Sequence, residues 1–144
     1  MGTLGVILMS HGEFAKAALE SAGMIVGETE NARALALTAD KSAEALEKEF
    51  TEVYKELSQQ YDTILCLCDI YGGTPFNVLS RCLVRGMDME AYTGLSLPLL
   101  IEVLLISEIE REELNGRLLE IQGQVLKKLE VRLTETDEPE LYDL

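Results

Sequence analysis

Apolar positions along this chain recur with two alternating periods, and that alternation predicts the order of its strands and helices. Two near-continuous apolar runs, Leu4–Met9 and Thr63–Cys68, are typical of strands that are covered on both faces. Shorter runs at Ala34–Leu37 and Met89–Tyr92 predict two further strands, and Val131–Leu133 can add a last one near the C-terminus.

Between these strands the apolar positions follow the helical period of 3.6 residues. The first predicted helix runs from Glu13 to about Val26, where Gly27 is well placed to end it, and Ser42 can cap the second. The apolar stripes expected to face the core are Phe14, Ala17, Ala18, Ala22 and Ile25 in the first helix, Leu46, Phe50, Val53 and Leu57 in the second, and Leu114, Leu118, Ile121, Val125 and Leu129 in the last.

Two prolines mark further helix starts. Thr74 is a natural N-cap with Pro75 at the first helical position of a helix that reaches about Leu83, and Pro98 starts another. Strands separated by helical segments of ten or more residues pair in parallel through right-handed crossovers. The sequence therefore predicts an α/β fold: a doubly wound, mostly parallel sheet with helices on both faces.

Length and composition indicate a single globular domain. The chain has 144 residues, enough to bury a core without disulfides, and its apolar residues are spread along its length. We expect one domain over residues 1–134 and a flexible acidic tail over residues 135–144. The formal net charge of −14 argues against binding to nucleic acid or to anionic membranes. It favours either a basic partner or simple solubility.

No apolar run reaches the roughly 18 residues that a membrane span needs, and no secretory signal is visible. Cys66 and Cys68 lie two residues apart in a predicted strand, so they share one face. We interpret them as reduced core thiols rather than metal ligands. These features predict a cytoplasmic protein without a metal or other cofactor.

The candidate chemistry centres on His11, the single histidine of the chain. It follows the first predicted strand, and in an open α/β sheet the carboxyl ends of the strands form the edge where ligands bind. Asp69 follows the third strand and the segment Gly94–Pro98 follows the fourth, so the three would converge there. A carboxylate at Asp69 would accept one imidazole N–H, leave the other nitrogen nucleophilic and stabilise the cation formed on phosphorylation.

The turn Gly72-Gly73-Thr74 at a helix start can bind an anion through its backbone N–H groups, although such residues are also ordinary turn chemistry. Ser10 can donate a further hydrogen bond to a phosphoryl group, or it is only a turn residue. Together, a nucleophile, an orienting acid and an anion-binding turn describe phosphoryl transfer through phosphohistidine.

Two other functions fit less well. A Ser-His-Asp hydrolase is disfavoured because Ser10 adjoins His11 and the chain has no Gly-x-Ser-x-Gly elbow. A receiver-type domain phosphorylated on Asp69 would need acidic residues after the first strand to hold Mg²⁺. Ser10-His11-Gly12 stands there instead.

Three motifs carry a resemblance to a known family: Met9-Ser10-His11-Gly12, the run Asp69–Asn77 and the run Gly94–Glu102. Over residues 1 to about 130, the chain resembles enzyme IIA components of the mannose-type sugar phosphotransferase system. The resemblance implies a cytoplasmic domain that takes a phosphoryl group from the phosphocarrier HPr and passes it to a IIB domain. IIB then phosphorylates the sugar as it enters through the membrane components IIC and IID. The family fold is a doubly wound sheet, usually dimeric, with a C-terminal antiparallel strand that subunits can exchange.

By this resemblance His11 stands where the phosphorylated histidine stands, and Asp69 where its hydrogen-bonding aspartate stands. Gly72, Gly73 and Thr74 fill the phosphate-side loop. The sequence departs from the pattern at Ser96, where many relatives carry Asn. It also has no Ala/Pro-rich linker and IIB domain after the tail, so we expect IIB to be a separate chain.

The resemblance also points to contacts with partners. Around the site, Phe14, Tyr71, Phe76 and the segment Leu95–Leu97, which includes Ser96, are candidates for HPr docking, although Phe14 and Phe76 can equally be core residues. An unpartnered strand at Val131–Leu133 predicts a homodimer. The alternative function is a phosphohistidine domain that regulates, or that feeds a soluble kinase of the dihydroxyacetone type, without coupling to transport.

Overall fold

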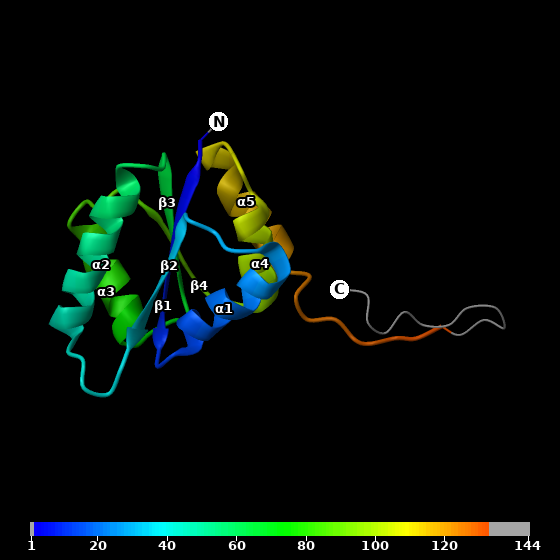
Figure 1. The fold of residues 1–144 in the computed structure, drawn as a ribbon, viewed down its shortest axis with the longest axis horizontal. Helices are drawn as coiled ribbons and strands as arrows, with labels where there is room; N and C mark the ends of the chain where they lie inside the picture. Colours follow the sequence, from blue (N-terminus) through cyan, green and yellow to red (C-terminus); the bar gives the residue numbers. More distant parts are fainter. Residues whose placement is uncertain (1, 133–144) are drawn as a thin grey trace.

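The structure is a computed structural model that describes residues 2–132 of the chain. Four strands and five helices alternate in this part (Figure 1). In chain order they are β1 (Leu4–His11), α1 (Phe14–Val26), β2 (Ala32–Leu37), α2 (Ala43–Ser58), β3 (Thr63–Cys68), α3 (Thr74–Val84), β4 (Glu90–Thr93), α4 (Leu97–Leu105) and α5 (Arg111–Gln122). Among the described residues, no helix is both long and apolar enough to cross a membrane.

The four strands form one sheet in the order β2-β1-β3-β4, and every pair is parallel. One isolated antiparallel bridge, Gly2 with Ile109, lies outside the strands. The chain therefore winds outward in one direction from β1 to β2 and in the other from β3 to β4. The predicted α/β, doubly wound fold is confirmed, and the switch between the two directions lies at the carboxyl ends of β1 and β3, the kind of position at which open α/β sheets bind ligands.

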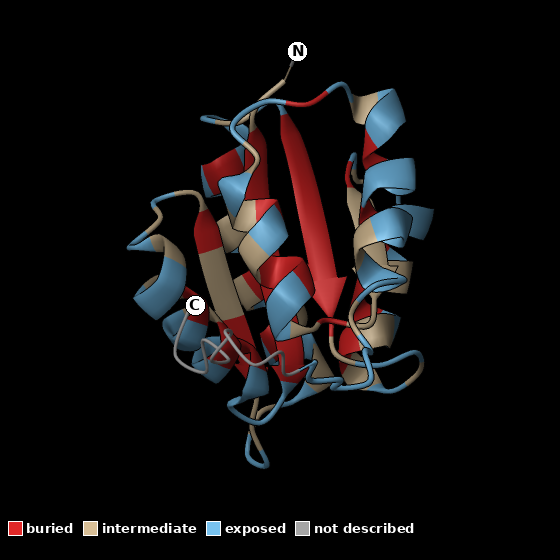
Figure 2. Ribbon diagram, turned by 90° about the vertical axis from the view of Figure 1, so that its right-hand side faces the viewer, coloured by how far each residue is buried: buried red, intermediate tan, exposed pale blue. Residues whose placement is uncertain are grey.

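The sheet separates two hydrophobic cores. Alternate residues of β1 point to opposite faces, so Val6 and Leu8 pack with α1, α4 and α5, whereas Ile7 and Met9 pack with α2 and α3. Figure 1 shows α2 and α3 on one side of the sheet and the other three helices on the opposite side. The central strands β1 and β3 are buried along most of their length, β2 and β4 are only partly buried, and the helices are exposed on their outer surfaces (Figure 2). This burial explains why the central strands read as continuous apolar runs.

The predicted stripe of the first helix is partly wrong. The residues of α1 that are buried are Ala15, Ala18 and Ala22, while Phe14 and Ile25 are half exposed. Ala18 and Ala22 face the core as predicted, whereas Ala17 is exposed and Ala15 is buried instead, because small side chains let α1 pack closely against the sheet and α4. In α2 the prediction is confirmed, because Leu46, Phe50 and Leu57 are fully buried.

The helix ends agree with the prediction at Ser42, but they differ from it at Thr74 and at the end of the last helix. Ser42 caps α2 by accepting a hydrogen bond from the backbone N–H of Ala45 at 3.1 Å, as expected. Thr74 is not the N-cap of α3, because Gly73 holds that position and Thr74 is already helical. The last helix ends at Gln122, so the predicted stripe positions Val125 and Leu129 lie beyond it.

The C-terminal strand expected at residues 131–133 is not observed in the described part of the chain. Val131 and Arg132 have no strand partner, and Leu133 lies outside the described residues, as does the predicted acidic tail. Leu126 and Leu129 are almost fully exposed here. Strand exchange between subunits accordingly stays a prediction.

Cys66, Cys68 and Cys82 are free and buried on the α2–α3 face of the sheet. Burial raises the pKa of the Cys66 thiol, and it raises the pKa of Cys68 to about 11. The prediction of reduced core thiols at Cys66 and Cys68 is confirmed.

Candidate functional site

The candidate site lies where β1 and β3 end side by side. Met9 in β1 is opposite Cys68 in β3, so two residues further along β1 and one along β3 bring His11 and Asp69 together. His11 is the last residue of β1, and Asp69 is the first residue after β3. The parallel register of two neighbouring strands is therefore what joins residues 58 positions apart.

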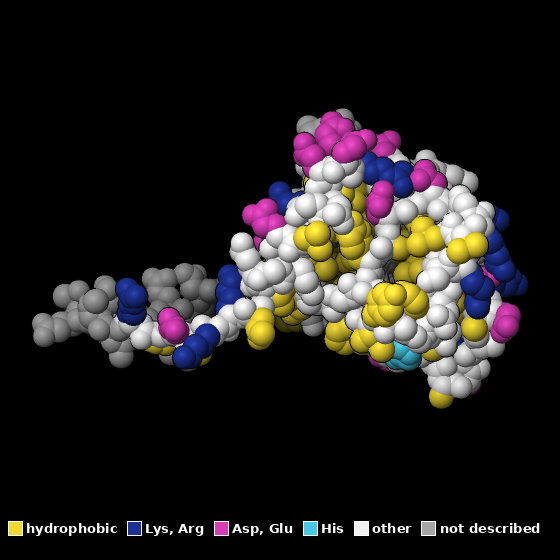
Figure 3. All heavy atoms as spheres, turned by 180° about the vertical axis from the view of Figure 1, so that it is seen from behind, with side chains coloured by type: hydrophobic (Ala, Val, Ile, Leu, Met, Phe, Trp, Pro, Cys, Tyr) yellow, Lys and Arg dark blue, Asp and Glu magenta, His cyan; other side chains and the backbone are white. Residues whose placement is uncertain are grey.

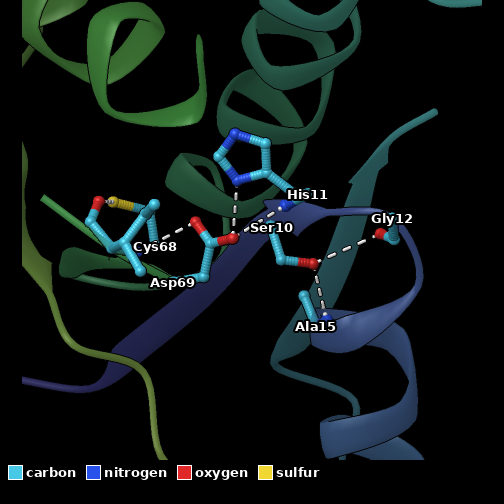
Figure 4. A network of polar contacts seen from close by, with 7 residues as sticks. Ser10, His11, Gly12, Ala15, Cys68 and Asp69 are labelled. Carbon is cyan, nitrogen blue, oxygen red and sulfur yellow. Dashed lines mark hydrogen bonds and ion pairs between the residues drawn. The ribbon is translucent and has the colours of Figure 1, made fainter. Parts of the chain in front are cut away.

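Asp69 holds His11 through both the backbone and the ring (Figure 4). Its Oδ2 accepts a hydrogen bond from the backbone N–H of His11 at 2.9 Å and lies 2.8 Å from Nδ1 of the ring. Its Oδ1 accepts the backbone N–H of Ile70 at 3.0 Å. An ionised carboxylate only accepts hydrogen bonds, so the ring carries its proton on Nδ1 and presents a lone pair on Nε2.

Burial and hydrogen bonding act in opposite directions on the Asp69 carboxyl. Burial tends to raise its pKa, but hydrogen bonds from the His11 backbone and ring and from the Ile70 backbone together lower it below its usual value. Asp69 is therefore ionised at neutral pH. A fixed negative charge beside Nδ1 stabilises a ring that becomes positively charged at Nε2.

The other edge of the imidazole faces the start of α3. A Cβ placed on Gly73 would lie 3.0 Å from Cε1 and 3.1 Å from Nε2 of His11, so the backbone passes directly against the ring. Gly73 has φ +89° and Gly72 has φ +86°, a backbone conformation that residues other than glycine rarely adopt. The two glycines therefore turn the chain so that a helix N-terminus approaches Nε2.

That helix start has the groups needed to bind an anion. The first helical hydrogen bond of α3 runs from the backbone N–H of Asn77 to the carbonyl of Gly73 at 2.9 Å. The N–H groups of Thr74 and Phe76 precede it, and Pro75 has none. Thr74 is half buried, and its hydroxyl makes no hydrogen bond within the described residues. Unpaired N–H groups and the positive end of the helix dipole favour a phosphoryl group beside Nε2.

Ser10 has a structural task, which corrects one prediction. Its side chain is fully buried and points toward α1, away from the ring (Figure 4). The hydroxyl accepts the backbone N–H of Ala15 at 2.7 Å and donates to the carbonyl of Gly12 at 3.3 Å. Both its donor and an acceptor site are used within the turn, so the Ser10 hydroxyl has no donor left for a phosphoryl group in this structure.

Exposed apolar side chains lie on the segments that surround His11. Phe14, Ile70 and Tyr71 are 50%, 55% and 80% exposed, and the Tyr71 ring lies 4.4 Å from that of half-buried Phe76. We call Phe14, Ile70, Tyr71 and Phe76 the apolar rim. Figure 3 shows hydrophobic side chains around the single histidine, while acidic side chains gather at the far end of the same face.

The segment after β4 contributes less to this surface than predicted. Leu95 is only 5% exposed and packs in the core with α1 and α4, so it is not a docking residue. Ser96 caps α4 by accepting the backbone N–H of Leu99 at 3.3 Å. The contact of Gly73 with the ring and the amide of Ile70 were not predicted individually. The contact of Gly73 with the ring could have been predicted only from the glycine pair that follows β3.

Residues 5–119 of the chain match the family model EIIA-man, which is described as the PTS system fructose IIA component. The fructose-specific EIIA component of Bacillus subtilis (strain 168) is 33% identical over 105 residues, which cover 73% of this chain and 71% of that protein. The mannose-specific EIIAB component of Escherichia coli (strain K12) is 30% identical over 142 residues. That match covers 95% of this chain and 43% of that protein, so the chain spans less than half of it.

Solved structures give the same match in three dimensions. The mannose/sorbose specific IIA subunit of the phosphotransferase system from Enterococcus faecalis superimposes with a TM-score of 0.80 at 28% identity, covering 92% of this chain and 98% of that one. The PTS IIA protein associated with the fucose utilization operon from Streptococcus pneumoniae gives a TM-score of 0.75 at 33% identity, with 87% and 93% covered.

Proposed function

The chain belongs to the mannose-type family of phosphotransferase-system IIA components, and from this premise we propose that it carries a phosphoryl group on Nε2 of His11. The observation that carries the proposal is the hydrogen-bonded pair of His11 and Asp69 at 2.8 Å, set against the N-terminus of α3. This pair leaves one ring nitrogen as a nucleophile and places anion-binding groups beside it.

In the proposed step the Nε2 lone pair of His11 attacks the phosphorus of a phosphorylated histidine on HPr. The new N–P bond forms as the old one breaks, and the electron pair of the old bond returns to the donor nitrogen. The proton on Nδ1 stays in place and remains bonded to Asp69. The positive charge that develops on the ring is balanced by the Asp69 carboxylate.

The phosphoryl charge is balanced by the backbone. No Lys or Arg side chain hydrogen-bonds to His11 or Asp69 in the part of the chain that the structure describes. The N–H groups of Thr74 and Phe76 and the hydroxyl of Thr74 are the donors that remain near Nε2. Such neutral donors bind the group without holding it as tightly as a cation would, which suits a carrier that must pass it on.

Two partners follow from this proposal: phosphorylated HPr as donor and a IIB domain as acceptor. Both must bring a small reactive side chain to His11, whose side chain is 47% exposed. In the complex, the side chains of the apolar rim would form the uncharged middle of a small, transient interface around His11. The net charge of −14 favours a basic surface on the donor and speeds encounter. We place the chain in the cytoplasm, where the resemblance places the IIA domains of this family, acting upstream of membrane components IIC and IID.

A homodimer belongs to the same proposal. Within the described residues β4 pairs with β3 on one side and has no strand on the other, and Leu129 and Val131 are exposed. An open edge strand and an apolar segment on one chain are complementary to those of a second copy.

The test is to incubate the protein with phosphoenolpyruvate, enzyme I and HPr, and to look for an acid-labile, base-stable gain of one phosphoryl group. His11→Ala is the matched variant, because the exposed side chain can be removed without opening the core. Label that persists in His11→Ala would contradict the proposed site. Adding a mannose-type IIB chain should then remove the label from the wild type. Label that the IIB chain does not remove, but that a soluble kinase of the dihydroxyacetone type does remove, would favour the alternative that is not coupled to transport.

A further inference from the structure

We infer that Gln122 is a positioning residue for the His11–Asp69 pair and acts through the loop between β4 and α4. This inference rests on the proposed function, since it concerns how fast His11 is phosphorylated. Gln122 is the last residue of α5 and is far from His11 in the sequence. None of the sequence patterns singles it out.

Both ends of the Gln122 amide bind the same loop. Its Nε2 donates to the carbonyl of Gly94 at 3.0 Å, and its Oε1 accepts the hydroxyl of Ser96 at 3.0 Å. An amide side chain offers a donor and an acceptor on one rigid plane. The two bonds fix the position of the loop and also its orientation, so Gln122 acts as a latch between α5 and the loop.

The latched loop holds the peptide group that precedes Asp69. The backbone N–H groups of Gly94 and Leu95 both donate to the carbonyl of Cys68, at 3.0 and 3.1 Å. On the other side, the N–H of Asp69 donates to the carbonyl of Met9 at 3.1 Å. The backbone of Asp69 is therefore held between β1 and the loop. A displacement of the loop is passed to the carboxylate that orients the His11 ring.

Other contacts hold the loop less specifically. Leu95 is buried and anchors the loop to the core, so loss of the latch does not release it entirely. Gly94 has φ +96° and lacks a side chain, which leaves this part of the loop free to pivot once the amide is removed. Gln122 itself is exposed, so its truncation creates no cavity. The expected defect is a misplaced catalytic pair in a folded protein.

The experiment compares Gln122→Ala with Gln124→Ala. Gln124 is the same residue type two positions on, is exposed and has no side-chain hydrogen bond within the described residues, so it is a matched control. Phosphoryl transfer from phosphorylated HPr is followed in single turnovers over a range of HPr concentrations. The ¹⁵N chemical shifts of the His11 ring are measured in the unphosphorylated protein.

We expect Gln122→Ala to lower the maximal transfer rate about threefold to tenfold, the range that follows from losing one or two ordinary hydrogen bonds. The HPr concentration for half-maximal rate stays unchanged, and the ring ¹⁵N resonances shift, because the Asp69 contact changes. Gln124→Ala matches the wild type in all three measurements.

The possible failures are distinguishable. Equal rates and equal ring shifts in the two variants would overturn the latch, while label on His11 leaves the proposed function intact. A higher half-maximal HPr concentration with unchanged ring shifts would make Gln122 a docking residue and would also overturn the inference. Absence of label on His11 of the wild type would overturn the proposed function itself.

Discussion

Gly73→Ala tests the geometry of the phosphorylation site most directly, because its neighbour supplies a matched control. Gly72 and Gly73 both have φ close to +90°, but only a Cβ on Gly73 would contact His11. A Cβ on Gly72 meets nothing within 4 Å. Gly72→Ala therefore imposes the backbone strain alone, and Gly73→Ala imposes the strain together with the contact.

The backbone strain lowers the stability of both variants. Gly73 has φ 89° and ψ 178°, a region that is open essentially only to glycine, and forcing another residue into it costs about 1–3 kcal/mol. A comparable loss is expected at Gly72 because of its positive φ. A domain of ordinary stability, about 5–15 kcal/mol, survives either loss at room temperature. Both variants are expected to fold with a lowered free energy of unfolding in urea.

The contact adds a defect in function at Gly73 only. Carbon atoms pack best at about 3.5–4.0 Å, so a Cβ at 3.0 Å from Cε1 pushes the ring by roughly half an ångström. That shift strains the 2.8 Å bond to Asp69, and the new methyl group sits 3.1 Å from the attacking nitrogen. A misplacement of 1 Å can cost about 10²-fold in rate, so we expect a loss of roughly 10- to 100-fold.

The assay is single-turnover transfer of labelled phosphoryl groups from HPr, with the variants compared at equal folded concentration. Gly72→Ala should transfer within about threefold of the wild-type rate if its effect is limited to strain away from the ring. Gly73→Ala transferring as fast as Gly72→Ala would refute the argument that the Nε2 edge meets the start of α3.

Four further predictions concern the charges and the assembly of the protein. Asp69→Asn should fold but slow phosphotransfer by at least tenfold, yet by less than the roughly 10⁴-fold loss seen for a catalytic-triad aspartate, because phosphorylated HPr is already a strong donor; unchanged rates in quench-flow would contradict the orienting role. Hydrogen bonds from His11 and Ile70 lower the pKa of Asp69 in the folded protein. The stability that this carboxylate contributes is therefore full above its unfolded pKa near 4 and is lost as the pH falls through the folded pKa. The difference in free energy of unfolding in urea between the wild type and Asp69→Asn should shrink on acidification below about pH 4. Raising the salt concentration should lower the second-order rate constant for transfer from HPr. A rate constant that does not depend on salt would show that the net charge of −14 serves only solubility. Light scattering at micromolar concentration should give twice the chain mass of 16.0 kDa, and a mass of 16.0 kDa would rule out the dimer.

Much of the fold could be predicted from the sequence because its signals are local. A strand covered on both faces must be apolar along its length, so Leu4–Met9 and Thr63–Cys68 were recognisable without tertiary information. The edge strand β2 was harder, since it begins two residues before the predicted Ala34. Arg33 interrupts the apolar pattern there, and its guanidinium donates to the carbonyls of Glu30 and Ala32 at the exposed edge of the sheet.

The candidate site could also be predicted only in part. The residue types at the ends of two buried strands pointed to His11 and Asp69, because parallel strands bring such positions to one edge. Their 2.8 Å contact depends on the register between β1 and β3, which only the packed sheet decides. The roles of Ser10, Leu95 and Gln122 depend on which way each side chain points and on what lies beside it. A pattern of hydrophobic and polar residues records the face of an element that is buried, whereas the partner of a single hydroxyl or amide is chosen by elements that meet only after folding.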